Sequence, residues 1–204
     1  MANYLYSNDL PDKLDLGQVV AIDTETMGLN PNRDRLCLVQ ISSGDGNAHL
    51  VQISPDEKFA VNLCRLLEDE NILKIFHFGR FDIAVLYNHF NILCNSVYCT
   101  KIASKLVRTF TDRHGLKNLL NELLSLDLSK QQQSSDWGNP KLTQAQIDYA
   151  ASDVLYLHRI KEELDIRLKR ENRMEIAQAC FDFLPKRAQL DILGWPEHDI
   201  FSHS

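Results

Sequence analysis

The sequence predicts an α/β fold: a mixed sheet in which an antiparallel meander is followed by parallel strands, with helices on both faces. Three runs rich in Val, Ile and Leu, over residues 18–23, 36–41 and 48–53, follow one another across short polar segments, as in a meander. After residue 54, short apolar runs alternate with segments of helical spacing, the pattern of parallel strands joined by helices.

The elements after the meander follow from local patterns. Ser54 is a candidate N-cap for a helix over residues 55–67. Apolar runs and helical spacing then predict, in order, a strand over 73–76, a helix over 79–90, a strand over 95–98 and helices over 100–107 and 116–126. The polar stretch 129–136 is predicted to be a loop.

The last third of the chain is predicted to be helical. Thr143 caps a long helix over residues 144–168, in which apolar residues recur every three or four positions and form one stripe. A second helix is predicted over 174–183, followed by a tail that contains proline.

Composition narrows the class of protein. The chain has 204 residues and is 44% hydrophobic, as expected of one globular domain. Its apolar runs are too short to span a bilayer, and its N-terminus lacks the layout of a signal peptide, so we expect no membrane contact and a cytoplasmic location. The five cysteines form no C-x-x-C pair, which argues against a disulfide framework or a zinc site.

Charge is unevenly distributed. The formal net charge of -6 argues against binding nucleic acid by bulk electrostatics. The segment 101–117 is nevertheless basic, and it suits either a phosphate-bearing substrate or an ordinary solvated face. Its charged residues are Lys101, Lys105, Arg108, Arg113 and Lys117, against Asp112 alone.

Four acidic residues stand in positions that need an explanation. Asp23 and Glu25 lie two apart at the end of a buried strand, so both side chains leave the same face and reach one point. Asp82 lies in the first turn of a predicted helix, where it also suits the helix dipole. Asp153 lies one turn after Tyr149, beside the apolar stripe, where a Tyr to Asp hydrogen bond is the simpler alternative. Converging carboxylates are what phosphodiester cleavage by two divalent cations requires.

Three segments resemble the exonuclease motifs of the DEDD superfamily in its tyrosine-containing branch: Val20-Ala-Ile-Asp-Thr-Glu-Thr-Met-Gly-Leu29, Phe81-Asp82 and Tyr149-Ala-Ala-Ser-Asp153. The segments His114-Gly-Leu-Lys117 and Lys130-Gln-Gln-Gln-Ser-Ser-Asp136-Trp137 are similar to ribonuclease D. The resemblance implies a ribonuclease-H-like fold and removal of nucleotides from the 3′ end of RNA, such as tRNA precursors, as 5′-monophosphates. Asp148 stands where the histidine branch has its histidine.

The resemblance also implies a role for each motif residue. Asp23 would bridge two divalent metal ions, Mg²⁺ or Mn²⁺, with Glu25 and Asp153 completing one site and Asp82 serving the other. Tyr149 would orient the attacking water, since a phenol that titrates near pH 10 is a poor general base. The candidate substrate-binding residues are Thr26, Met27, Leu29, His77, Phe81, Lys117, Lys130 and Trp137, for several of which packing or solvent exposure is the alternative.

Two departures from the family pattern affect these expectations. His77 is followed by Phe-Gly-Arg where many relatives have Asn-Ala. Residues 1–170 would form the 3′–5′ exonuclease domain, leaving 171–204 as a helix and tail packed on it rather than separate helical nucleic-acid-binding domains. Oligomerisation would be another route to substrate grip. The alternatives are an exonuclease acting mainly on DNA and a non-catalytic RNA-binding module.

Overall fold

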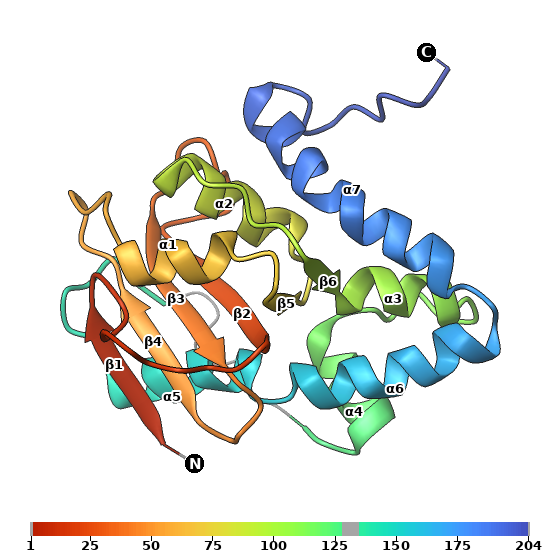
Figure 1. The fold of residues 1–204 in the computed structure, drawn as a ribbon, viewed down its shortest axis with the longest axis horizontal. Coiled ribbons are helices and arrows are strands. Elements are labelled where there is room, and N and C mark those ends of the chain that lie inside the picture. The colour runs from red at the N-terminus through yellow and green to blue at the C-terminus, as the bar shows by residue number, and fades with distance from the viewer. Residues whose placement is uncertain (1, 128–134, 204) are drawn as a thin grey trace.

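The computed structural model describes residues 2–127 and 135–203 and contains a six-stranded mixed sheet (Figure 1). Its strand order is β1-β4-β3-β2-β5-β6. The strands are β1 (Asn3–Ser7), β2 (Val19–Thr26), β3 (Leu36–Ser42), β4 (Ala48–Gln52), β5 (Leu73–Phe76) and β6 (Val97–Cys99).

The strand directions agree with the predicted fold class. β2, β3 and β4 form an antiparallel meander, and β5 and β6 extend the sheet in parallel from β2. The sequence analysis did not predict β1, which pairs in parallel with β4 at the edge of the sheet. Its five residues are mostly exposed, so they lack the apolar pattern that marks the other strands.

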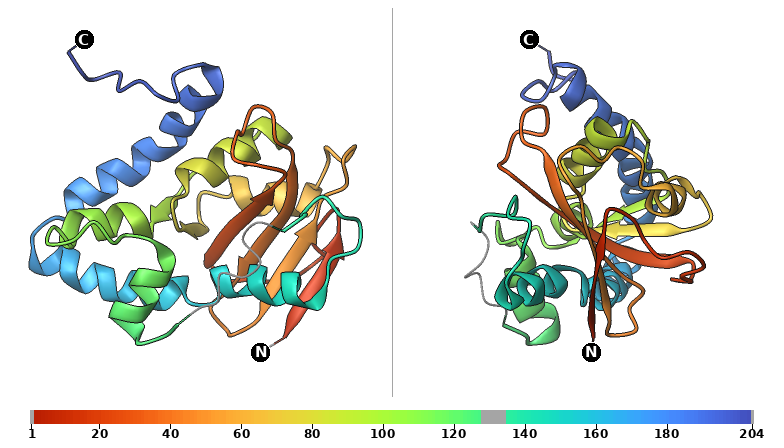
Figure 2. Two further views of the ribbon diagram at one scale, coloured as in Figure 1. Left: turned by 180° about the vertical axis from the view of Figure 1, so that it is seen from behind. Right: turned by 90° about the vertical axis from the view of Figure 1, so that its left-hand side faces the viewer.

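Helices cover both faces of the sheet. α1 (Val61–Glu68) and α2 (Arg80–Phe90) lie in front of it, whereas α5 (Gln144–Val154) lies behind it (Figures 1 and 2). Both faces of β3 are therefore buried along its whole length. This confirms the predicted α/β sandwich of a mixed sheet between helices.

The first helix begins later than predicted. Residues 55–60 are not helical, and α1 begins at Val61. Its cap comes from a distant residue: the Asp9 carboxylate accepts hydrogen bonds of 2.9 Å from the backbone N–H groups of Asn62 and Leu63. An acceptor more than 50 residues away leaves no local sign of where the helix starts, so the prediction from Ser54 was wrong.

The predicted long helix is two helices. α5 ends at Val154, and α6 (Leu157–Arg170) continues after a short break at Leu155 and Tyr156. Both helices bury members of the same apolar stripe, which is why the spacing predicted one element. The break leaves Asp153 in the last turn of α5.

The C-terminal region extends further as helix than predicted. α7 (Met174–Leu193) contains Pro185 in its interior and packs against α2 and β6. A proline normally ends a helix, which is why the prediction stopped at residue 183. The division of the chain near residue 170 stays a prediction. Among the residues described, no helix combines the length and apolar character needed to cross a bilayer.

The remaining helices, α3 (Thr100–Val107) and α4 (Leu116–Leu124), connect the sheet to α6. α3 follows β6 directly and has the predicted bounds. The loop between α3 and α4 and the first turn of α4 reach the carboxyl end of β2, where the acidic residues lie.

Candidate active site

Asp23 and Glu25 are carried by β2, the strand between the meander and the parallel strands. Because side chains alternate along a strand, both leave the same face of the sheet, and Thr24 leaves the other. Gln40 on β3, which is fully buried, donates a hydrogen bond of 3.4 Å from Nε2 to Asp23 Oδ2. The ladder shifts register between Glu25 and Thr26, so the strand ends just after the acids.

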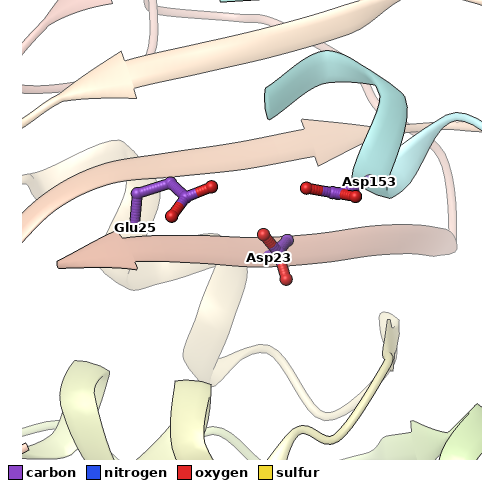
Figure 3. A group of neighbouring side chains, drawn as sticks. All are labelled: Asp23, Glu25 and Asp153. Carbon is purple, nitrogen blue, oxygen red and sulfur yellow. The ribbon is translucent and has the colours of Figure 1, made fainter. Parts of the chain in front are cut away.

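Asp153 meets these two residues from α5. The start of α5 is fixed by a capping box between Thr143 and Gln146, as the predicted cap required. Carboxylate oxygens of Asp23, Glu25 and Asp153 lie within 4.8 Å of one another, and Figure 3 shows the three side chains converging. The carbonyl end of the helix dipole adds further negative potential beside Asp153, an arrangement that favours a cation.

Asp82 lies in the first turn of α2, where it is buried and lines the same cavity. Its Oδ1 accepts a hydrogen bond of 2.7 Å from Thr24 Oγ1, which fixes the direction of the carboxylate. It is not one of the three acids whose oxygens approach within 4.8 Å. Asp82 therefore lies outside the three-carboxylate group and would serve a second ion, directly or through water.

Burial and mutual repulsion make all four acids hard to ionise in the absence of a cation. Burial raises the pKa of Asp23 well above its ordinary value, with further contributions from the charges of Asp82 and Asp153. Burial and the same two neighbours raise the pKa of Glu25 to about 9. Burial raises the pKa of Asp82 and of Asp153 to about 7. A bound divalent cation removes this penalty by supplying the missing positive charge.

Tyr149 stands beside this cluster on α5. Burial and the charge of Asp153 raise the pKa of its hydroxyl, so the phenol stays protonated at neutral pH and interacts with the Asp153 carboxylate. Its ring lies 6.1 Å from that of Trp137, centroid to centroid. A protonated phenol at this place can form a hydrogen bond with a water molecule but cannot take its proton.

A cavity of about 640 Å³ joins the acids to the predicted substrate-binding residues. Leu29 is 88% exposed and Met27 is 54% exposed, whereas Trp137 is buried in the wall. Lys130 lies outside the described residues. The cavity is lined by Asp23, Glu25, Asp82, Tyr149 and Asp153, and also by Thr26, Met27, Leu29, His77, Phe81, Lys117 and Trp137.

The basic segment divides into two kinds of residue. Lys101 and Lys117 line the cavity, where they suit phosphate. Arg108 is almost fully buried, with its guanidinium bonded to Glu122, Ser104 and the carbonyl oxygen of Arg113. It holds the loop before α4 in place, so for this residue neither the phosphate nor the solvent interpretation was right.

The sequence analysis did not single out some cavity residues. Phe78 has a positive φ of 67°, which is unusual for an aromatic residue, and the Lys101 ammonium lies 4.1 Å from the centre of its ring. Thr24 and Asn118 were also missed, although Thr24 stands inside the first quoted motif and Asn118 directly follows Lys117. Thr24 and Asn118 were overlooked because the acids and the lysine next to them were the candidate functional groups. No local sequence pattern indicates the positive φ of Phe78.

The donor set fits divalent cations that prefer oxygen. Opposite ligands of one Mg²⁺ lie about 4.2 Å apart, close to the spread of the three converging carboxylates. None of the four acids forms an ion pair with a lysine, arginine or histidine within residues 2–127 and 135–203. Asp23, Glu25 and Asp153 would hold one ion, and Asp23 and Asp82 a second.

Comparison with known proteins identifies the family. Residues 6–169 match the 3′–5′ exonuclease family. The chain belongs to this family. The match includes all four acids and Tyr149, and it confirms both the predicted family and the predicted enzyme class, a hydrolase that acts on phosphodiester bonds.

Ribonuclease D proteins are relatives within this 3′–5′ exonuclease family. Ribonuclease D of Granulibacter bethesdensis is 35% identical over 155 residues, which cover 76% of this chain and 39% of that protein. The chain thus spans about two fifths of the length of the curated relatives it matches.

Solved exonuclease structures match over the whole chain. Brucella melitensis NrnC with bound Mg²⁺ is 57% identical, with a TM-score of 0.96 and full coverage of both chains. The same Brucella protein bound to pGG is 58% identical, with a TM-score of 0.97 and again full coverage of both chains. These similarities support the ribonuclease-H-like fold that the sequence predicted.

Proposed function

We propose that this protein is a divalent-metal-dependent 3′–5′ exoribonuclease, similar to ribonuclease D, that releases nucleoside 5′-monophosphates from RNA 3′ ends. The observation that carries the proposal is the meeting of Asp23, Glu25 and Asp153 within 4.8 Å, with Asp82 and Tyr149 in the same cavity. These five residues come from β2, α2 and α5, so packing of the sheet and helices brings them together. The bound Mg²⁺ of the similar NrnC supports Mg²⁺ or Mn²⁺ as the cofactor.

The protein's own groups divide the work of hydrolysis. When bound, two divalent cations would lower the pKa of the attacking water and neutralise the charge that develops on the leaving 3′ oxygen. Asp23, Glu25 and Asp153 would hold the first ion, and Asp23 together with Asp82, which Thr24 fixes, would hold the second. Tyr149 forms a hydrogen bond with the water and so orients it for attack in line with the leaving oxygen.

The rest of the cavity suits the end of a single strand. The exposed side chains of Met27 and Leu29 offer apolar surface for a base, and Phe81 adds an aromatic ring. Lys101 and Lys117 supply positive charge for backbone phosphates at the rim. The binding of pGG by NrnC supports a short 5′-phosphorylated oligonucleotide as a ligand of this site.

A matched set of oligonucleotides tests the proposed function. RNA and DNA strands of one sequence, each with a free or a blocked 3′ hydroxyl, are incubated with the protein and Mg²⁺. We expect stepwise shortening of the RNA with a free 3′ end and release of 5′-monophosphates. Faster shortening of DNA would support the DNA exonuclease alternative, and tight binding without cleavage would support a non-catalytic RNA-binding module.

The C-terminal region would stabilise the exonuclease domain rather than act as a separate nucleic-acid-binding domain. α7 packs along α2, and Arg80 on α2 forms an ion pair of 2.6 Å with Asp191 on α7. Exposed apolar side chains on α7 and the tail, including Phe183, Leu193 and Phe201, are compatible with the oligomerisation expected from the sequence. Sedimentation of the full chain measures that state directly.

A further inference from the structure

His77 lies at the carboxyl end of β5, in the cavity that also contains the acidic cluster. β2 and β5 pair in parallel as far as Ala21 and Ile75, and His77 follows just beyond Phe76, the last residue of β5. The imidazole lines the same cavity as the acids.

Thr100 fixes the tautomer of this histidine. The Thr100 hydroxyl is fully buried and donates its single hydrogen, over 3.2 Å, to the backbone carbonyl oxygen of Phe76. With that hydrogen directed at Phe76, the 2.9 Å contact between Thr100 Oγ1 and His77 Nδ1 is assigned as a hydrogen bond donated by the histidine. His77 is therefore protonated at Nδ1, and its Nε2 carries a free lone pair.

The ring is neutral, and Nε2 has no partner within the part of the chain that the structure describes. Burial, with a smaller contribution from the charge of Lys101, lowers the pKa of His77 to about 3. Among the described residues, Nε2 makes no hydrogen bond, and it is not one of the buried polar atoms that lack one. It is therefore open to the cavity as a hydrogen-bond acceptor.

We propose that Thr100 holds His77 so that Nε2 accepts a hydrogen bond from a ribose hydroxyl at the 3′ end of the substrate. Phosphates carry no donor at neutral pH, so a neutral acceptor in this cavity selects a hydroxyl or a base N–H. His77 lines the same cavity as Asp23, and the ribose is the part of the nucleotide bonded directly to the phosphate, so a ribose hydroxyl is the donor assigned to Nε2. This inference rests on the proposed function and makes His77 a determinant of sugar specificity.

The first test compares the rates of the wild type and of His77→Phe, which keeps a ring but removes the acceptor. The substrates are one RNA oligonucleotide, its version with 2′-deoxyribose in the last two nucleotides, and its version with 3′-deoxyribose in the terminal nucleotide alone. We expect kcat/KM of the wild type to fall about three- to tenfold when the hydroxyl that His77 contacts is missing. In His77→Phe the same removal should change kcat/KM less than twofold. A rate that falls only with the 2′-deoxy substrate assigns the contact to the 2′ hydroxyl, and a rate that falls only with the 3′-deoxy substrate assigns it to the 3′ hydroxyl.

Thr100 supplies a second test with a matched pair. Thr100→Ser keeps the hydroxyl and should keep the sugar preference, whereas Thr100→Val removes it and should reduce that preference. Nitrogen-15 NMR of the metal-free protein reports the tautomer directly. Nε2 should be unprotonated in the wild type and in Thr100→Ser, and partly protonated in Thr100→Val.

The outcomes separate this inference from the proposed function. Suppose that the wild type shortens RNA, but that each deoxy substitution lowers kcat/KM by the same factor in His77→Phe as in the wild type. The inference is then wrong, and the exonuclease assignment stands. An Nε2 that is protonated in the wild type overturns it equally. If the wild type shortens neither RNA nor DNA, the proposed function fails, and the NMR tautomer still reports on the Thr100 to His77 hydrogen bond.

Discussion

Two buried acidic sites in this molecule differ in how their charge is balanced. Asp191 on α7 accepts hydrogen bonds from Arg80 at 2.6 and 2.8 Å and from Arg187 at 3.0 Å. The four acids of the cavity have no such cationic partner among the residues described. A satisfied carboxylate stabilises a fold, whereas a buried group of unpaired carboxylates costs stability and is explained by a ligand that supplies positive charge.

The largest effect should come from removing one of the unpaired acids. Asp153→Asn removes a charged ligand from the three-carboxylate group, and we expect kcat/KM on a labelled RNA strand to fall about a thousandfold or more. Asp148→Asn on the same helix is the matched control, because Asp148 is exposed, lies outside the cavity and accepts hydrogen bonds from Asn3 and Gln144. Equal activities of the two variants would remove Asp153 from the site.

Removing the paired acid should affect stability instead. Asp191→Asn leaves two arginines without their shared carboxylate, and we expect the free energy of unfolding to fall by about 2 kcal/mol, since Arg80 is partly exposed. Urea unfolding measures it. Asp182→Asn, on the exposed side of the same helix, should change stability by less than about 0.5 kcal/mol. An unchanged urea midpoint in Asp191→Asn would show that the ion pairs of Asp191 do not stabilise the fold, and would contradict the difference between the two acidic sites.

Tyr149→Phe should have an intermediate effect on the chemistry. The ring and its packing against Trp137 remain, while the hydroxyl that orients the water is lost. We expect kcat to fall about tenfold with little change in KM. Single-turnover kinetics separates the two constants, and Tyr156→Phe outside the cavity serves as the control. A rise in KM at constant kcat would make Tyr149 a substrate-binding residue instead.

A further expected effect is a pH dependence of stability. Burial and the charges of Asp153 and Asp82 raise the pKa of Glu25 to about 9, so the folded protein binds its proton more tightly than the unfolded chain does. Stability of the metal-free protein should therefore fall as pH rises from 7 to 9, above the range in which histidines titrate. Thermal melts in a chelator measure the slope. The fall in melting temperature with pH should be smaller in Glu25→Gln, and smaller in the wild type with Mg²⁺, than in the metal-free wild type. The same fall in all three samples would contradict the account.

The sequence predicted the acidic site better than the helix boundaries around it. Asp23 and Glu25 could be predicted because a buried strand dictates which face its side chains leave, and Tyr149 and Asp153 because one helical turn separates them. The start of α1 could not, since its cap is supplied by Asp9 from elsewhere in the chain. The break after Val154 has no glycine or proline to mark it, and an apolar stripe reports burial rather than continuity.

The substrate side of the cavity shows the same limit. His77 could be proposed from its motif, but the state of its ring depends on Thr100, more than 20 residues later, and on the packing of β5 against β6. Phe78 acquires its positive φ from the turn between β5 and α2. Such features arise from tertiary contacts, so patterns within one segment do not contain them.

The central claim is that the four unpaired acids hold a pair of divalent ions. Anomalous diffraction from crystals of the full chain grown with Mn²⁺ tests it most directly. The account predicts two peaks, one among Asp23, Glu25 and Asp153 and one between Asp23 and Asp82. Ordered carboxylates with no peak at a saturating concentration of Mn²⁺, or peaks only elsewhere on the protein, would contradict it.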